Sequence, residues 1–118
     1  MQIEIQARDF PLTAALRDHV EKRLRFALSR FSDRVQRVAV RLSDVNGPRG
    51  GQDKNCHLHV RLRGLPDIVV RNTESDLYVA VDRASGRAGR ALRRGMVRAS
   101  AVFSRRSFAR MQETEAAT

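Results

Sequence analysis

The segment DLYVAVDRASGRAGRALRRGMVRA (76–99) carries an apolar stripe and a basic stripe, both at the spacing of a helix. At about 100° per residue, its apolar side chains share one side and its arginines lie nearly opposite. The apolar side comprises Leu77, Val81, Ala84, Ala88 and Leu92. The arginine side comprises Arg83, Arg87, Arg90, Arg94 and Arg98. We therefore predict a helix from about residue 75 to residue 99, begun by a capping pair of Thr73 and Asp76, with one side packed on a core.

The residues before this helix predict four strands and one further helix. Alternation of apolar and polar residues is typical of half-buried strands. Thr13 is a suitable N-cap for a helix whose apolar residues recur at helical spacing. A turn-rich segment, DVNGPRGGQDKN, predicts a long hairpin loop. The predicted strands cover 2–7, 37–42, 56–63 and a segment that starts at Ile68; the helix covers 13–30 and the loop 44–55.

This element order, β-α-β-β-β-α, predicts a single α+β domain over residues 1–103. The first crossover should be right-handed and make the first two strands parallel, while hairpins make the remaining neighbours antiparallel. Each helix has one apolar stripe, so both should cover the same face of a four-stranded mixed sheet. Residues 104–118 are polar and rich in small side chains, and we expect them to form a flexible tail.

The composition indicates a polyanion as partner. The chain has 118 residues, 23 Lys and Arg against 13 Asp and Glu, and a net charge of +10. All but two of those 23 cations are arginine, whose planar fork matches phosphate oxygens better than the lysine point charge does. Cys56 stands alone, so no internal disulfide is predicted. We see no secretory signal and no run of membrane-spanning length, and expect a cytoplasmic protein without a membrane partner.

The arginines of the last helix are the strongest functional signal. From Arg83 to Arg110 there are nine arginines and no acidic residue, although like charges at helical spacing repel one another. This pattern predicts a phosphate-binding surface, to which we add Arg93 and, from the first helix, Lys22, Arg23 and Arg25. The open face of the sheet should carry further RNA contacts, together with Arg71. Those further contacts are predicted at Arg37, Arg41, Arg61 and Arg63. A domain that is basic on two faces suits a cleft with nucleic acid on both walls.

Aromatic residues are scarce, with five Phe, one Tyr and no Trp. We expect Phe26, Phe31 and Tyr78 to pack against the core, which leaves no aromatic platform on the sheet for stacking single-stranded bases. Recognition should therefore work through backbone phosphates and the shape of folded RNA. Gly86 and Gly89, which flank the apolar stripe, are better explained by close packing of the helix than by phosphate binding.

The sequence resembles the family of ribosome hibernation-promoting factors, which is also known as the ribosome-associated inhibitor A family. The resemblance covers roughly residues 1–100. It rests on MQIEIQARDFPLTAALRDHVEKRL (1–24), FSDRV (31–35), DLYVAVDRA (76–84) with its basic helix, and NGPRGGQDKNC (46–56). It implies a fold similar to double-stranded-RNA-binding domains and a position in the small ribosomal subunit.

Members of that family occupy the path of mRNA and of the A- and P-site tRNAs, and thereby silence idle ribosomes. The resemblance implies contacts with 16S rRNA from Arg87, Arg90 and Arg94 of the last helix and from Arg23 of the first. Long members carry a further C-terminal domain that pairs ribosomes. The sequence resembles the short form, which we expect to be a monomer when free, with no cofactor and no small-molecule substrate.

Three alternatives compete with this hypothesis. An enzyme or metal site could use Asp53, His57 and His59, but two strand histidines make an incomplete site, and Cys56 is predicted to lie in the core without a base beside it. A protein-binding regulator of the sigma-factor modulation type would also favour a basic surface. A general binder of structured RNA is the third alternative, and would bind any duplex with similar affinity.

Overall fold

The chain forms one four-stranded sheet with two long helices. The computed structural model describes residues 1–44 and 53–117, and the side chains of those residues up to Val102. Residues 45–52, which contain most of the predicted hairpin loop, lie outside the described residues. The elements are β1 (Gln2–Arg8), α1 (Ala14–Ala27), η1 (Ser29–Arg34), β2 (Val35–Asp44), β3 (Lys54–Leu62), β4 (Ile68–Glu74) and α2 (Leu77–Ala117), where η1 is a 3-10 helix.

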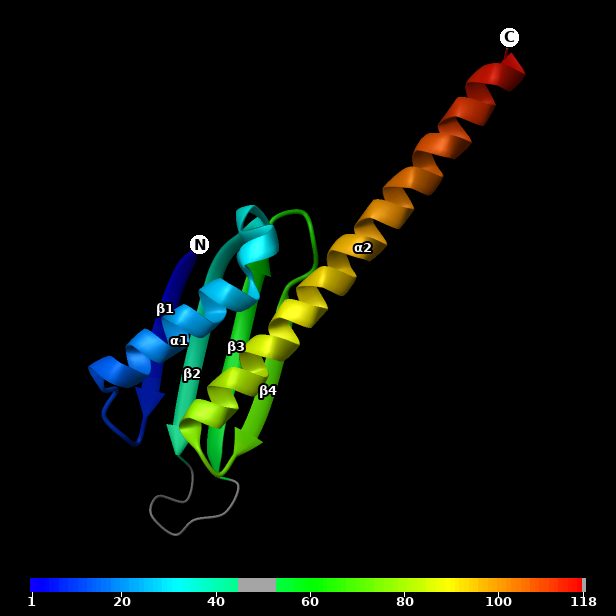
Figure 1. Cartoon of the computed structure of the whole chain (residues 1–118). Coiled ribbons are helices and arrows are strands. Elements are labelled where there is room, and N and C mark those ends of the chain that lie inside the picture. Colours follow the sequence, from blue (N-terminus) through cyan, green and yellow to red (C-terminus); the bar gives the residue numbers. More distant parts are fainter. Residues whose placement is uncertain (45–52, 118) are drawn as a thin grey trace.

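The strands lie in the order β1-β2-β3-β4. β1 is parallel to β2, and the β2–β3 and β3–β4 pairs are antiparallel. Both helices cross the same face of this sheet, with α1 over the β1–β2 side and α2 over β3 and β4 (Figure 1). The predicted α+β fold, with a mixed four-stranded sheet and two helices on one face, is confirmed.

The core lies between the sheet and the two helices. Its strand residues are those that the alternation placed on the inner face, and its helix residues are the predicted apolar stripes. Burial of such side chains is the main favourable contribution to folding. Leu16, Val20, Leu24, Val38, Val40, Leu42, Cys56, Leu58, Val60, Leu62, Val81, Ala84, Ala88 and Leu92 are all buried. The prediction that Phe26 packs is wrong, because that ring is 76% exposed, whereas Phe31 packs partly against the core.

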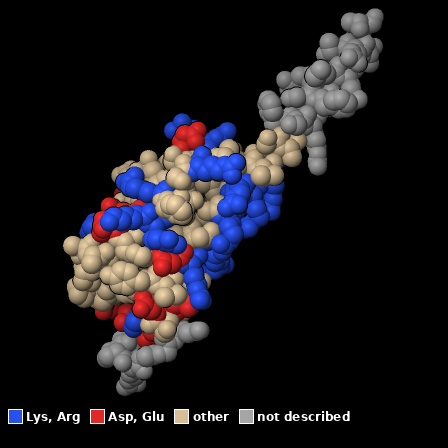
Figure 2. Space-filling view, viewed as in Figure 1, with Lys and Arg blue, Asp and Glu red and all other residues tan. Residues whose placement is uncertain are grey.

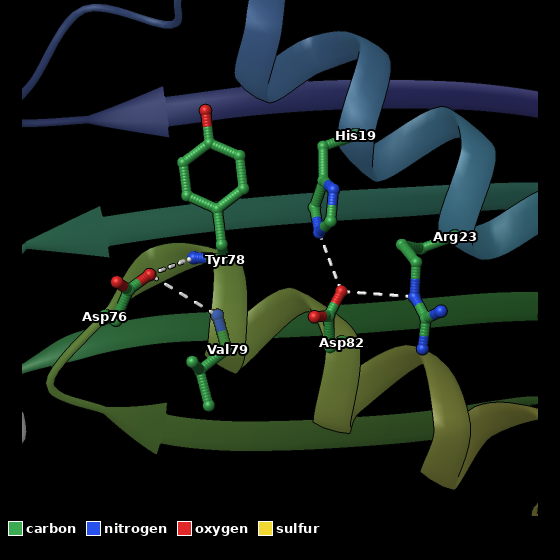
Figure 3. Close-up of polar contacts among 6 residues, drawn as sticks. All are labelled: His19, Arg23, Asp76, Tyr78, Val79 and Asp82. Carbon is green, nitrogen blue, oxygen red and sulfur yellow. Dashed lines mark hydrogen bonds and ion pairs between the residues drawn. The ribbon is translucent and has the colours of Figure 1, made fainter.

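Each long helix begins at a side-chain cap. Thr13 caps α1 as predicted, since its Oγ1 accepts a hydrogen bond of 3.1 Å from the Leu16 amide. The start of α2 differs from the prediction because Thr73 belongs to β4. Asp76 is the residue that caps α2. Its Oδ1 accepts hydrogen bonds from the amides of Tyr78 at 2.7 Å and Val79 at 3.4 Å (Figure 3).

The α2 helix continues well beyond residue 99. Its 41 residues correspond to a length of about 60 Å, and its C-terminal half extends past the sheet (Figure 1). The predicted helix end is therefore wrong, because no glycine or proline after Gly95 stops the helical pattern. The helical backbone includes most of the predicted tail, and the flexibility of residues 104–118 stays a prediction.

The contact between the helices depends on one glycine. A Cβ atom at Gly89 would lie 2.7 Å from the carbonyl oxygen of Ala27, so only glycine allows this approach of α2 to α1. The packing interpretation is thus correct for Gly89. It is wrong for Gly86, where a Cβ would meet only the end of the Arg90 side chain at 3.4 Å.

Candidate nucleic-acid interface

The five arginines of the predicted stripe on α2 and the added Arg93 are all exposed: Arg83, Arg87, Arg90, Arg93, Arg94 and Arg98. Figure 2 shows blue side chains gathered in a band along α2, where it passes the edge of the sheet, whereas red and blue alternate elsewhere on this face. The apolar side of the helix faces the core, so its basic side must face solvent. The structure therefore places the guanidinium groups outward, as the helical spacing predicts.

Two of the six guanidinium groups already have partners. Arg83 Nη1 lies 2.8 Å from Oε1 of Glu74, at the end of β4. Arg87 Nη1 donates a hydrogen bond of 2.8 Å to the backbone carbonyl of Arg71. No acidic residue lies within the stripe along the helix sequence. In the folded structure, however, the adjacent strand β4 supplies a carboxylate to Arg83, the first arginine of the stripe.

The other four arginines are free of ion pairs within the described part of the chain: Arg90, Arg93, Arg94 and Arg98. Three of the four, Arg90, Arg94 and Arg98, also border grooves on the protein surface. Arg87, Arg90 and Arg94 line a groove of about 350 Å³ between α2 and β4. Arg94 and Arg98 also border a second groove of about 550 Å³ towards the β3–β4 turn. A phosphate chain lying along these grooves would meet several guanidinium forks in succession.

The basic residues of α1 are less available than the sequence suggested. Lys22 Nζ pairs with Asp18 at 2.9 Å on the same helix. Arg23 Nε lies 3.1 Å from Oδ1 of Asp82 on α2, and His19 Nε2 donates to that same oxygen at 2.7 Å (Figure 3). Only Arg25, of the three predicted α1 contacts, is exposed with no ion pair among the described residues.

Tyr78 shares this helix–helix contact. Its ring meets the His19 imidazole edge-on, with the ring centroids 4.9 Å apart, and the side chain remains partly exposed. The predicted position near the core is thus correct only in part, because Tyr78 packs against the rim of α1 rather than into the interior.

On the open face of the sheet, some of the predicted cations are paired and others are not. Arg37 forms an ion pair with Glu4 of β1. Arg41, Arg61 and Arg63 are exposed and make no ion pair to a described residue. The His59 imidazole lies 2.8 Å from Asp67, and this hydrogen bond holds the pKa of that carboxyl below its usual range. The open face therefore keeps Arg41, Arg61 and Arg63 free of ion pairs with the described residues, whereas Arg37 is neutralised.

The residues of the metal-site alternative do not converge. Asp53 is buried beside Lys54, with Oδ1 3.4 Å from the ammonium nitrogen, while His59 is paired with Asp67. Among the side chains that the structure describes, no three His, Cys, Asp or Glu residues gather as a metal ion would require. Burial raises the pKa of the Cys56 thiol to about 12, so this side chain stays protonated at neutral pH.

Sequence reasoning missed two acidic residues that form ion pairs with arginines predicted to bind RNA. Glu74 neutralises Arg83, and Asp82 holds Arg23. It also left Arg71 out of the main set, although strand alternation placed it on the open face. The pairing of Asp82 had a signal in the sequence, because Asp82 lies on the border of the apolar stripe, where a neighbouring helix can reach it.

In the described residues, no helix is both long and apolar enough to cross a membrane. The sequence model of the family described as sigma 54 modulation protein / S30EA ribosomal protein matches residues 3–99. Comparison with the curated proteins finds no match.

Two solved structures are similar to this chain. The N-terminal domain of Protein Y from Thermus thermophilus is 30% identical, with a TM-score of 0.66 over 80% of this chain and 98% of that one. A ribosomal subunit interface protein from Coxiella burnetii is 22% identical, with a TM-score of 0.66 over 80% and 96% of the two chains, and bears on the fold alone.

Proposed function

The chain belongs to the sigma 54 modulation protein / S30EA ribosomal protein family, and from this premise we propose that it is a ribosome-binding hibernation factor. It inhibits translation by occupying the path of mRNA and of the A- and P-site tRNAs in the small subunit. The α2 arginines contact 16S rRNA there. A protein with this role works in the cytoplasm, as a free monomer until it meets a ribosome.

The observation that supports this proposal is that Arg90, Arg94 and Arg98 border the grooves beside α2 and form no ion pair with a described residue. Holding like charges together without carboxylates costs a few tenths of a kcal/mol for each pair at helical spacing. An anionic partner offsets this cost, and RNA phosphates in series match the spacing of guanidinium groups along a groove. The paired Arg83 contributes less to binding than the other members of the stripe.

The test is co-sedimentation of the full chain with 30S subunits and 70S ribosomes, with and without competing mRNA and tRNA. The variant R90Q/R94Q removes two unpaired guanidinium groups and keeps good helix formers at both positions. Its control, R17Q/R30Q, removes the same charge from exposed positions on α1 and η1. We expect R90Q/R94Q to lose association at moderate salt and the control to retain it.

Three results would contradict the proposal. Equal loss in both variants would mean that net charge alone governs association. Equal affinity for an isolated RNA duplex and for 30S subunits would indicate the general RNA-binding alternative, while co-migration with RNA polymerase instead of ribosomes would indicate the sigma-factor alternative. Binding should also weaken steeply with salt, because each phosphate contact on a duplex releases about 0.9 counterions.

A further inference from the structure

The open face of the sheet carries a second basic site, formed by one row of cross-strand neighbours. Arg41 of β2 lies directly opposite His57 of β3, and His57 lies directly opposite Arg71 of β4. Directly opposite residues have Cβ atoms about 5 Å apart, so the three side chains span about 10 Å on one face. Gln6 of β1 continues the same row, since it pairs with Arg41.

These side chains surround a shallow pocket. The pocket measures about 770 Å³ and is bordered by Arg8, Arg41, His57 and Arg71 together with Gln6 and Asn55. No carboxylate lines it among the described residues. The neighbouring row differs, because there His59 is satisfied by Asp67.

Two residues that line this pocket each have a buried polar atom without a hydrogen-bond partner among the described residues: His57 Nε2 and Asn55 Oδ1. Each such atom loses its hydration without replacement, which is unfavourable in the free protein. A protonated imidazole can donate from Nε2, and an amide turned by 180° presents its NH₂ group instead of its oxygen. Both groups can therefore act as donors to an anion that enters between the two arginines.

We propose that Arg41, His57 and Arg71 form a binding site for a phosphate group on the open face of the sheet. The two guanidinium groups approach the phosphate from either end of the row, while His57 donates from its centre and Asn55 from the adjacent row. This site lies on the sheet face opposite the one that α2 covers. Phosphate binding at this site does not depend on RNA binding by the α2 arginines. The phosphate can be a phosphodiester of RNA or a free phosphate group, since both present the same oxygens.

Binding at this site takes up a proton. In the free protein, burial lowers the pKa of His57, and the nearby charges of Arg71, Arg41 and His59 lower it further. Arg8 of β1 is a further cation at the pocket. A bound phosphate stabilises the imidazolium and raises the His57 pKa. The affinity for phosphate should consequently increase as the pH falls from the His57 pKa of the phosphate-bound protein to the lower His57 pKa of the free protein.

The three histidines of the chain allow a direct test. The ring Cε1–H signals of His19, His57 and His59 are followed by NMR in the full chain between pH 5 and pH 8. One titration adds inorganic phosphate against sodium chloride of equal ionic strength, and the other adds a short RNA duplex. We expect the His57 pKa to rise on addition, while His59 and His19 serve as internal controls.

Two variants complete the design. R41T/R71T removes both arginines with a strand-forming residue, and R17Q/R30Q removes the same charge elsewhere. We expect R41T/R71T to abolish the His57 response and to lower the salt slope of RNA binding by about 2, with R17Q/R30Q unchanged in the His57 response. Should R41T/R71T not fold, which circular dichroism would reveal, H57Q provides the same test through loss of pH-dependent binding.

Each outcome decides the matter. A His57 response to inorganic phosphate supports a site for small phosphates, and a response to RNA alone supports a site for phosphodiesters. No response to either, equal responses of all three histidines, or equal loss in R17Q/R30Q would overturn the proposal. Failure here leaves the ribosome co-sedimentation of R90Q/R94Q unaffected, so the two proposals are separable.

Discussion

Asp82 of α2 accepts a hydrogen bond of 2.7 Å from His19 of α1, and this contact joins the two helices at their rim. The same oxygen lies 3.1 Å from Arg23 Nε, although that nitrogen is not hydrogen-bonded to it. One carboxylate thereby orients α1 on α2 and restrains an arginine that the sequence assigned to RNA.

Replacing Asp82 with Asn should therefore destabilise the domain only moderately. The contact is partly exposed, so we expect a loss of about 0.5–1 kcal/mol in the free energy of unfolding, measured by urea denaturation at neutral pH. A double-mutant cycle with H19A isolates the pairwise contribution. If the two substitutions prove additive, the helices are held together by packing alone and this prediction is wrong.

Two glycines of the same helix should respond in opposite directions to the same substitution. G89A places a methyl group 2.7 Å from the Ala27 carbonyl oxygen, which cannot move without shifting α1. We expect a loss of about 1–3 kcal/mol. G95A meets nothing within 4 Å, so it should gain up to about 1 kcal/mol from the better helix propensity of alanine. Thermal and urea unfolding of both variants check the pair, and a stable G89A would refute the close helix–helix contact.

Release of Arg83 from its carboxylate should strengthen binding to ribosomes or RNA. Glu74 Oε1 accepts from Arg83 at 2.8 Å and from Asn72 at 3.1 Å. E74Q removes the charge and makes Arg83 available for one more phosphate contact, which should steepen the salt slope by about 0.9. The control E21Q removes the same charge from α1, where no ion pair holds it among the described residues. Equal strengthening by E21Q would mean that only net charge changed.

Stability should fall in mild acid because of His57. Its pKa in the folded state is below the ordinary 6.5, chiefly through burial. Well above pH 6.5 the ring is neutral in both states and contributes no pH dependence. Below pH 6.5 the unfolded chain takes up the proton first, so the free energy of unfolding decreases until the folded-state pKa is also passed.

The measurement for His57 is the urea midpoint at pH 7.5, 6 and 5, in phosphate-free buffer. We expect H57Q to show a smaller decrease than the unaltered chain. Asp67 does not interfere, because its pKa is lowered from 3.8 and it stays ionised throughout this range. Equal decreases in the two proteins would show that other groups cause the acid sensitivity.

Prediction from sequence worked best where the repeat of apolar and polar residues along a strand or a helix decides which way a side chain points. Alternation placed Val38, Val40 and Leu42 in the core, and helical spacing placed the arginines of α2 outward. It worked least well at the limits of elements. Thr73 looked like a helix cap but lies in β4, and the tail pattern did not reveal that α2 continues to Ala117. Phe26 was expected inside because it is apolar, yet it lies on the outer side of α1.

By itself, the sequence determined the element order, the face to which each side chain points and the basic character of α2, because these follow from periods of two and 3.6 residues and from composition. Only the tertiary structure decided which charges meet. The period of a strand leaves its register open, so the row of Arg41, His57 and Arg71 exists only in the paired sheet. Likewise, ion pairs act over a few ångströms, and the folded chain alone brings Glu74 to Arg83 and Asp82 to His19.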